Sequence, residues 1–187
     1  MNRADYLSNE IEKITFSDLP GDVVERCKDL ILDQLGCEIA FSKLEWSRAA
    51  YRYAKHRRSS GDSTVLVYGD KMASEDAAVC NSVFGHGFEM DDTDTWTTSH
   101  PGACIIPSCF AAAEELDKSG QDFIVAMVAG YETLMRVGRV GKSMYKKNWH
   151  GTAVPGGIGV AAAVGKLLGL DALGIKNAIG IATSHIG

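Results

Sequence analysis

Apolar side chains recur every three or four residues along most of the chain, which is the spacing of a helix that buries one face. The repeat is clearest over residues 22–40, where valines, leucines, isoleucines and cysteines form one stripe. The same spacing predicts further helices over residues 46–58, 74–88, 108–117, 119–138, 154–168 and 171–182.

Short polar signals predict where several of these helices begin. Ser74 precedes Glu75 and Asp76, a pattern typical of an N-cap followed by acids in the first helical turn. Ser119 and Asp171 are placed to cap the helices that follow them. A serine hydroxyl or an aspartate carboxylate at this position accepts a hydrogen bond from a backbone N–H that the helix leaves free.

Two segments break the helical pattern. Residues 63–68 form a β-like run, and Gly69 with Asp70 supplies a turn signal behind it. Residues 90–102 are acidic, rich in threonine and without an apolar period, which predicts a loop. Pro107 is then expected in the first turn of the next helix. The predicted fold class is all-α, a multi-helix domain with at most one short strand or hairpin.

Composition and charge narrow the class of protein. The 187 residues are 45% apolar and carry a net charge of −5, which is typical of a folded soluble chain and excludes intrinsic disorder. No broad basic face is available for nucleic acid, and the basic run 55–58 suits a helix C-terminus. The sequence shows no secretion signal. It also has no apolar run of the roughly 20 residues that a membrane span needs. Five cysteines without a paired spacing indicate reduced thiols, so we expect a cytoplasmic protein.

One glycine motif imitates a nucleotide-binding signature. Residues 157–162 match the G-x-G-x-x-A fingerprint, whose glycines let a backbone approach a pyrophosphate after a strand. Here a polar loop precedes the motif and helices follow it. The glycines are therefore predicted to allow close helix packing.

The segment around the acidic loop concentrates chemistry-bearing side chains. Four acids fall between Glu89 and Asp94, with His86 before them and His100 after them. Like charges packed this densely are unfavourable unless cations, hydrogen bonds or water compensate, and such strain often marks function. A structural interpretation has the acids capping nearby backbone while His86 satisfies a helix end. A second interpretation is a metal site, whose ligands would be His86, Glu89, Asp92 and His100. No paired-histidine motif supports that site.

A further histidine precedes the glycine- and alanine-rich helix. His150 lies between Trp149 and Gly151, where its imidazole would face a pocket bounded by the N-terminal amides of that helix. Together with His100 it provides two groups that titrate near neutrality. Proton transfer beside a carboxylate substrate requires groups of this kind.

Several segments, in this order, resemble motifs of the MmgE/PrpD family, which includes 2-methylcitrate dehydratases and cis-aconitate decarboxylases. They are an early helix signature, an Asn-x-x-x-x-His motif, an acidic loop ending in His-Pro, a Gly-Tyr-Glu-x-x-x-Arg helix, an aromatic-His-x-Thr turn and a Gly-Lys-Leu-Leu-Gly-Leu segment. Their positions are residues 33–37, 81–86, 86–101, 130–136, 149–152 and 165–170.

The resemblance implies a lyase that removes water or carbon dioxide from a small polycarboxylate, without a metal or another cofactor. It implies that residues 1–187 are an N-terminal helical domain, truncated before a second α/β domain. The expected associations are a homodimer or contact with a missing C-terminal portion, with no nucleic-acid or membrane partner.

The resemblance also implies a set of site residues. His100, His150 and Asp92 are expected to be catalytic, and Glu89, Thr93 and His86 to bind substrate. In this hypothesis His100 and His150 share proton transfer and carboxylate binding, Asp92 orients an imidazole, and Thr93 hydrogen-bonds the substrate. Many family members have Asp where this chain has Glu89.

Two other functions remain open from the sequence. One is a catalytically silent helical module that acts through self-association or partner binding. The other is a metal-dependent hydrolase built on the metal site considered above.

Overall fold

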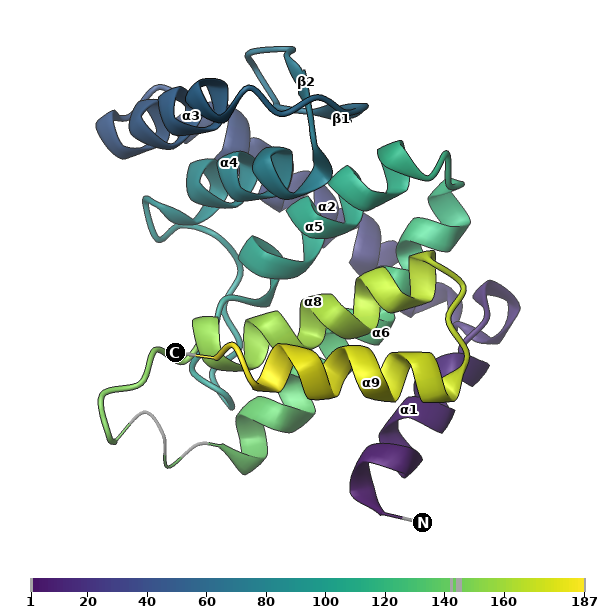
Figure 1. The fold of residues 1–187 in the computed structure, drawn as a ribbon. Helices are drawn as coiled ribbons and strands as arrows, with labels where there is room; N and C mark the ends of the chain where they lie inside the picture. Colours follow the sequence, from purple (N-terminus) through teal and green to yellow (C-terminus); the bar gives the residue numbers. More distant parts are fainter. Residues whose placement is uncertain (1, 142, 144–145, 187) are drawn as a thin grey trace.

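The computed structural model describes residues 2–141, 143 and 146–186, and within them the chain is built of helices and one small hairpin (Figure 1). The α-helices are α1 (Arg3–Lys13), α2 (Gly21–Phe41), α3 (Glu45–Arg57), α4 (Ser74–His86), α5 (Pro101–Glu115), α6 (Gly120–Val140), α8 (Ala153–Leu167) and α9 (Ala172–Thr183). The remaining elements are the 3₁₀ turn η1 (Phe16–Asp18) and the strands β1 (Ser63–Thr64) and β2 (Lys71–Met72). The predicted all-α fold is confirmed.

The helices pack around one main core. Helices α4, α5, α8 and α9 follow one another across the face seen in Figure 1, and α6 packs against α8. The main core lies where α2, α5, α6 and α8 meet, and it includes the buried side chains of Ile105, Met127 and Leu134. Helix α1 closes against α9 through Ile11 and Ile175, so helices from the two ends of the chain lie side by side.

Small residues let α6 and α8 approach closely. A Cβ atom added at Gly159 of α8 would lie 2.9 Å from the carbonyl oxygen of Gly130 in α6. A Cβ atom at Gly130 would lie 3.0 Å from the Cβ of Ala163. The glycine motif therefore lies inside a helix and serves helix packing, as predicted.

The helix caps agree with the sequence in part. Ser119 and Asp122 form a capping box at α6, and Asp171 accepts a hydrogen bond from the N–H of Gly174 in α9. The sequence pattern did not predict α1, whose polar first turn is held by a capping box between Asn2 and Asp5.

The predicted N-cap of α4 and the predicted start of α5 were wrong. Helix α4 begins at Ser74 itself, with no side-chain cap, and Asp76 in its first turn pairs with Arg57 at 2.9 Å. Helix α5 begins at Pro101, so Pro107 lies inside it. Pro101 takes the first-turn position because the missing N–H of a proline costs nothing there. The internal proline gives up one backbone hydrogen bond, and burial of the surrounding apolar residues offsets that loss.

The predicted strand is shorter than its sequence run. Ser63 pairs antiparallel with Met72 and Thr64 with Lys71, and the chain turns at once after Val65. The reversal is tight because the N–H of Gly69 donates to the carbonyl of Val65 at 2.9 Å. The β-like pattern therefore reflects burial of Val65 in a hairpin that packs on α5.

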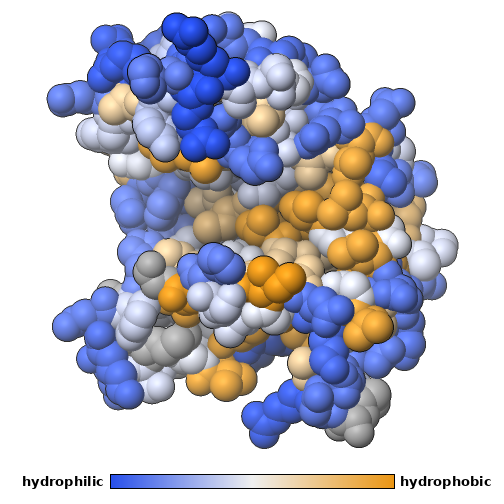
Figure 2. All heavy atoms as spheres, viewed as in Figure 1, coloured by the Kyte–Doolittle hydropathy of each residue, from blue (hydrophilic) through white to orange (hydrophobic). Residues whose placement is uncertain are grey.

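The molecular surface carries apolar as well as charged regions. Figure 2 shows a face that is hollowed across its middle, where apolar residues gather between polar residues above and below. Among the residues that the structure describes, no helix combines the length and apolar character needed to cross a membrane. Exposed apolar surface is typical of interaction sites, and the homodimer stays a prediction.

Candidate active site

Two stretches of the chain converge at the acidic loop: the continuous run from the end of α4 to the start of α5, and the turn before α8. Helix α4 ends at His86, the loop carries residues 87–99, α5 begins just after His100, and the turn before α8 carries His150. The chain reverses directly after α4, because the N–H of Glu89 donates to the carbonyl of His86 at 2.9 Å and Glu89 adopts a positive φ of 58°. This reversal folds the loop back over the end of its own helix.

Asp91 is the buried centre of the site. Its side chain is 0% exposed, and its two carboxylate oxygens lie 3.1 and 3.2 Å from Nδ1 of His86. Its Oδ1 also lies 3.3 Å from Nδ1 of His100. The ring centroids of the two histidines are 4.8 Å apart. One carboxylate therefore holds two imidazoles side by side.

Glu89 lies on the solvent side of the same two rings. Its carboxylate oxygens are each 3.6 Å from an Nε2 atom, one on His86 and one on His100. The Glu89 side chain is 65% exposed, so these contacts are screened by water and contribute little to stability. The buried contacts of Asp91 therefore fix the rings, and Glu89 covers them loosely.

The contact between Asp91 and His86 affects the pKa of His86. The contact with Asp91 raises the pKa of His86 above its ordinary value, against the opposite effect of burial. A protonated His86 beside an ionised Asp91 forms a neutral pair, which lowers the cost of burying both charges.

Asp92 makes its hydrogen bonds to α5 and α6 and none to an imidazole. It accepts hydrogen bonds from the N–H of Gly102 at 2.8 Å and from the hydroxyl of Tyr131 at 2.9 Å. Burial raises the pKa of Asp92. A Cβ atom at Gly102 would lie 2.7 Å from Oδ1 of Asp92, so this contact requires glycine. Asp92 thus ties α5 to α6, and Asp91 contacts the imidazoles where the sequence hypothesis had Asp92.

Thr93 lies at the mouth of a separate hollow. This hollow has a volume of about 550 Å³ and lies between α2, α6 and the acidic loop. Thr93 is exposed there. The ionisable residues of the lining are four acids and one base: Asp29, Asp33, Asp92, Asp94 and Arg26. These charges, taken alone, favour a cation over a polycarboxylate.

His150 is held by the start of α8. Its Nδ1 accepts hydrogen bonds from the backbone N–H groups of Thr152 and Ala153, both at 3.2 Å. Its ring centroid is 6.2 Å from that of His86, in an edge-on arrangement. The hydroxyl oxygen of Thr152 accepts a hydrogen bond from the N–H of His100 at 2.9 Å, which joins the two histidine segments. The predicted residues His86, Glu89, His100 and His150 therefore come together.

The loop itself is braced from within and from its neighbours. The backbones of Asp94 and Ser99 exchange hydrogen bonds, and Asp94 accepts a further one from the N–H of Thr97 at 3.0 Å. The guanidinium of Arg139 lies 4.6 Å from the ring centre of Trp96. These contacts give the threonine-rich stretch a defined shape.

The possible metal ligands differ from those that the sequence suggested. Within the described residues, His86, Asp91 and His100 each offer one ligand atom, and these atoms lie within 4.8 Å of one another. Asp92, which the sequence hypothesis included, is not in this group. Two imidazoles and a carboxylate suit a transition metal, but the same atoms already contact one another in ion pairs.

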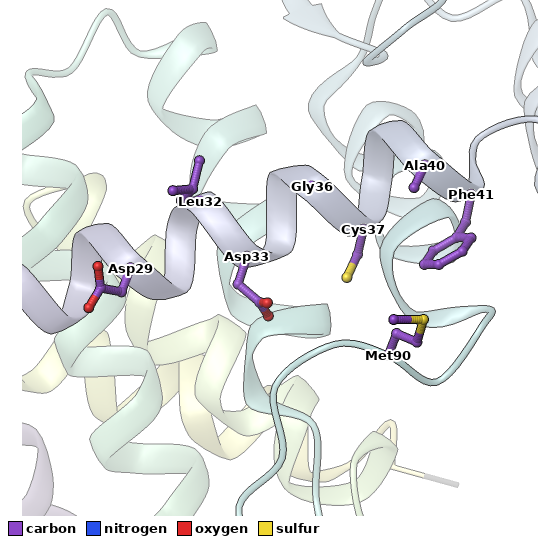
Figure 3. A pocket seen from close by; sticks show the side chains of 8 residues that line it. All are labelled: Asp29, Leu32, Asp33, Gly36, Cys37, Ala40, Phe41 and Met90. Atoms are coloured by element: carbon purple, nitrogen blue, oxygen red, sulfur yellow. The ribbon is translucent and has the colours of Figure 1, made fainter.

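A second hollow lies along α2 and shares Asp29 and Asp33 with the first (Figure 3). Its volume is about 440 Å³, and Cys37 and Phe41 of α2 point towards Met90 of the loop. Its two ionisable carboxylates, Asp29 and Asp33, would repel an anionic ligand. The histidine cluster is therefore the better candidate for chemistry on a polycarboxylate.

Comparison with known proteins gives a family and several relatives. Residues 5–187 match the model of the MmgE/PrpD N-terminal domain. Over 97% of its length the chain is 35% identical to the cis-aconitate decarboxylase-like protein oryM of Aspergillus oryzae. It is 35% identical to the cis-aconitate decarboxylase of Aspergillus terreus over 90% of its length, and 34% identical to that of Homo sapiens over 88%. The chain spans 39%, 36% and 36% of these three relatives.

Proposed function

Because the chain belongs to the MmgE/PrpD family, we propose that its histidine cluster transfers protons in a lyase that acts on a small polycarboxylate. The observation that carries this proposal is the pair of imidazoles held by the buried Asp91, with His150 beside them. Relatives named as cis-aconitate decarboxylases support decarboxylation of cis-aconitate as the first candidate reaction. Dehydration of 2-methylcitrate is the second.

Decarboxylation of cis-aconitate requires a proton donor. The bond between a carboxyl carbon and its methylene breaks, carbon dioxide leaves, and the electron pair forms a new double bond. The electrons of the old double bond move to the carbon beside another carboxylate, and that carbon takes up one proton. An imidazole N–H is able to stabilise the enolate-like charge and supply this proton, and it regains one from water.

Dehydration requires both a base and an acid. The base removes a proton from the carbon beside a carboxylate, and the acid protonates the hydroxyl group that leaves as water. His100 and His150 are two groups of the right kind for these tasks. The proposed mechanism therefore needs only imidazoles and the carboxylate that positions them.

Incubation of the purified chain with cis-aconitate and with 2-methylcitrate tests the function, with products followed by proton NMR. The same assay is run on the chain together with any further coding sequence of its gene. Formation of an unsaturated dicarboxylate from cis-aconitate, or of an unsaturated tricarboxylate from 2-methylcitrate, supports the lyase. Absence of turnover in every preparation would favour the silent association module.

The trio of His86, Asp91 and His100 favours a metal-dependent hydrolase as the alternative. Elemental analysis and treatment with a chelator separate the two functions. The proposed lyase keeps its turnover after chelation. A stoichiometric divalent metal whose removal abolishes turnover would support the alternative.

A further inference from the structure

Two contacts determine which nitrogen of His150 carries a proton. The N–H groups of Thr152 and Ala153 both point at Nδ1 of His150, each at 3.2 Å. A nitrogen that accepts hydrogen bonds must present its lone pair, so Nδ1 is bare. A neutral imidazole then carries its proton on Nε2.

The opposite holds at His100. Its Nδ1 lies 3.3 Å from Oδ1 of Asp91, and Asp91 has a fully buried side chain. This Nδ1 is buried and has no hydrogen-bond partner among the described residues, so the carboxylate oxygen of Asp91 faces it at ion-pair distance without a hydrogen bond. A bare Nδ1 would place a lone pair against a carboxylate oxygen, which is repulsive. A protonated Nδ1 is attracted to it. Nε2 also faces a carboxylate, that of Glu89, but this contact is longer at 3.6 Å and the Glu89 side chain is 65% exposed, so water screens it. The buried contact with Asp91 therefore decides the tautomer, and Nε2 is bare in the neutral ring.

We propose that the backbone at the start of α8 and the carboxylate of Asp91 hold His150 and His100 in opposite neutral tautomers. His150 presents an Nε2–H donor, and His100 presents a bare Nε2 acceptor. Asp91 is a positioning residue, because it acts through His100.

The chemical use of these tautomers rests on the proposed function. His150 supplies the N–H that stabilises developing negative charge and delivers a proton, and His100 is the imidazole that is able to remove one. In dehydration both roles are used, so a proton leaves carbon for His100 and a proton from His150 leaves with the hydroxyl as water. In decarboxylation the donor His150 is the group that acts on carbon. The two histidines therefore have different roles in the proposed reaction, which the sequence alone did not distinguish.

The tautomers are measurable in the free chain without any substrate. Long-range proton–nitrogen correlation spectra of protein with ¹⁵N-labelled histidine report which ring nitrogen is protonated, at about pH 8 where an ordinary imidazole is neutral. His100→Gln and His150→Gln assign the signals. The expected result is a bare Nδ1 on His150 and a bare Nε2 on His100. A proton on Nδ1 of His150, or the same tautomer on both rings, would overturn the proposal.

Substitution of Asp91 tests its positioning role. Asp91→Asn is expected to lower the population of the Nδ1–H tautomer of His100 and to leave His150 unchanged, whereas Asp91→Glu retains the carboxylate and restores the preference. Asp76→Asn is the matched control, because Asp76 is another buried carboxylate that pairs with Arg57 and contacts neither histidine. A normal His100 tautomer in folded Asp91→Asn would contradict the role of Asp91. If Asp91→Asn does not fold, the spectra of the unaltered chain and of Asp91→Glu still decide the assignment.

The outcomes separate this inference from the proposed function. If the opposite tautomers are found but His100→Gln and His150→Gln keep full turnover, the proposed function fails and the tautomers stand. If turnover depends on both histidines but their tautomers match, this inference fails alone.

Discussion

Asp91 and Asp92 are neighbours with identical side chains, and the fold gives them opposite surroundings. Asp91 is buried against His86 and His100, whereas Asp92 bonds the N–H of Gly102 and the hydroxyl of Tyr131. The sequence hypothesis gave the orienting role to Asp92, whereas Asp91 is the acid that lies against the imidazoles. The loop has no hydrophobic period, so the direction of each side chain depends on the reversal after α4.

The pKa of His86 is a direct measure of its contact with Asp91. Because the folded pKa lies above the unfolded value of about 6.5, protonation of His86 stabilises the fold fully below about pH 6.5. This stabilisation is lost as the pH rises through the raised pKa. Asp91→Asn removes the largest cause, so the pKa of His86 is expected to fall in an NMR titration. Asp76→Asn should leave it unchanged, and an unaltered His86 titration in Asp91→Asn would refute the assigned contact.

At the scale of elements, the apolar period predicted most helices but not all of their ends. Stripes such as that of α2 are visible because each buried position follows the last by three or four residues. Helix α1 carries a short stripe of Leu7 and Ile11, one turn apart, which the sequence analysis did not assign to a helix. The start of α5 depends on Pro101 following directly on a loop histidine. The position of each helix relative to the site depends on contacts between distant residues, such as that between Thr152 and His100.

The crossing of α6 and α8 provides a matched pair of glycine substitutions. Gly159→Ala is expected to destabilise the fold by about 1–3 kcal/mol, because the added Cβ would lie 2.9 Å from the carbonyl oxygen of Gly130. Gly157→Ala meets nothing within 4 Å on the same helix, so it should stabilise by about 0.5–1 kcal/mol. Denaturant unfolding measures both. Equal effects of the two substitutions would contradict the described packing.

The interface between α2 and α4 buries an acid whose charge is not compensated. Glu38 is 0% exposed, accepts one hydrogen bond from Gln34, and has a second oxygen without a partner among the described residues. Burial raises the pKa of Glu38 to about 8. An acid whose pKa is raised on folding destabilises the fold as the pH increases from its unfolded pKa, about 4.5, to its folded pKa.

Glu38→Gln is therefore expected to make stability less dependent on pH. The unaltered chain should lose a few kcal/mol between about pH 4.5 and pH 8, and the variant should lose less. Chemical denaturation at both ends of this range is the measurement, with the exposed Glu12→Gln as control. Parallel losses in Glu38→Gln and in the unaltered chain would show that Glu38 is not the cause.

At the scale of the whole molecule, charge limits where a polycarboxylate is able to bind. The hollow beside Thr93 holds four acids and one arginine, and the hollow against α2 has only acids among its ionisable residues. The histidine cluster holds three imidazoles, one of them with a raised pKa, beside the carboxylates of Asp91 and Glu89. We therefore assign the proposed proton transfer to this cluster, where the run from α4 to α5 meets the turn before α8.

The most direct test compares turnover of cis-aconitate and 2-methylcitrate by an active preparation and by three histidine-to-glutamine variants. His150→Gln is expected to lower kcat for either substrate, and His100→Gln to lower kcat for dehydration of 2-methylcitrate, by about 10²–10⁴-fold while the fold is kept, because each removes the imidazole that the step uses. His56→Gln, at the exposed end of α3, should retain full turnover. Wild-type turnover in both His100→Gln and His150→Gln would contradict the account.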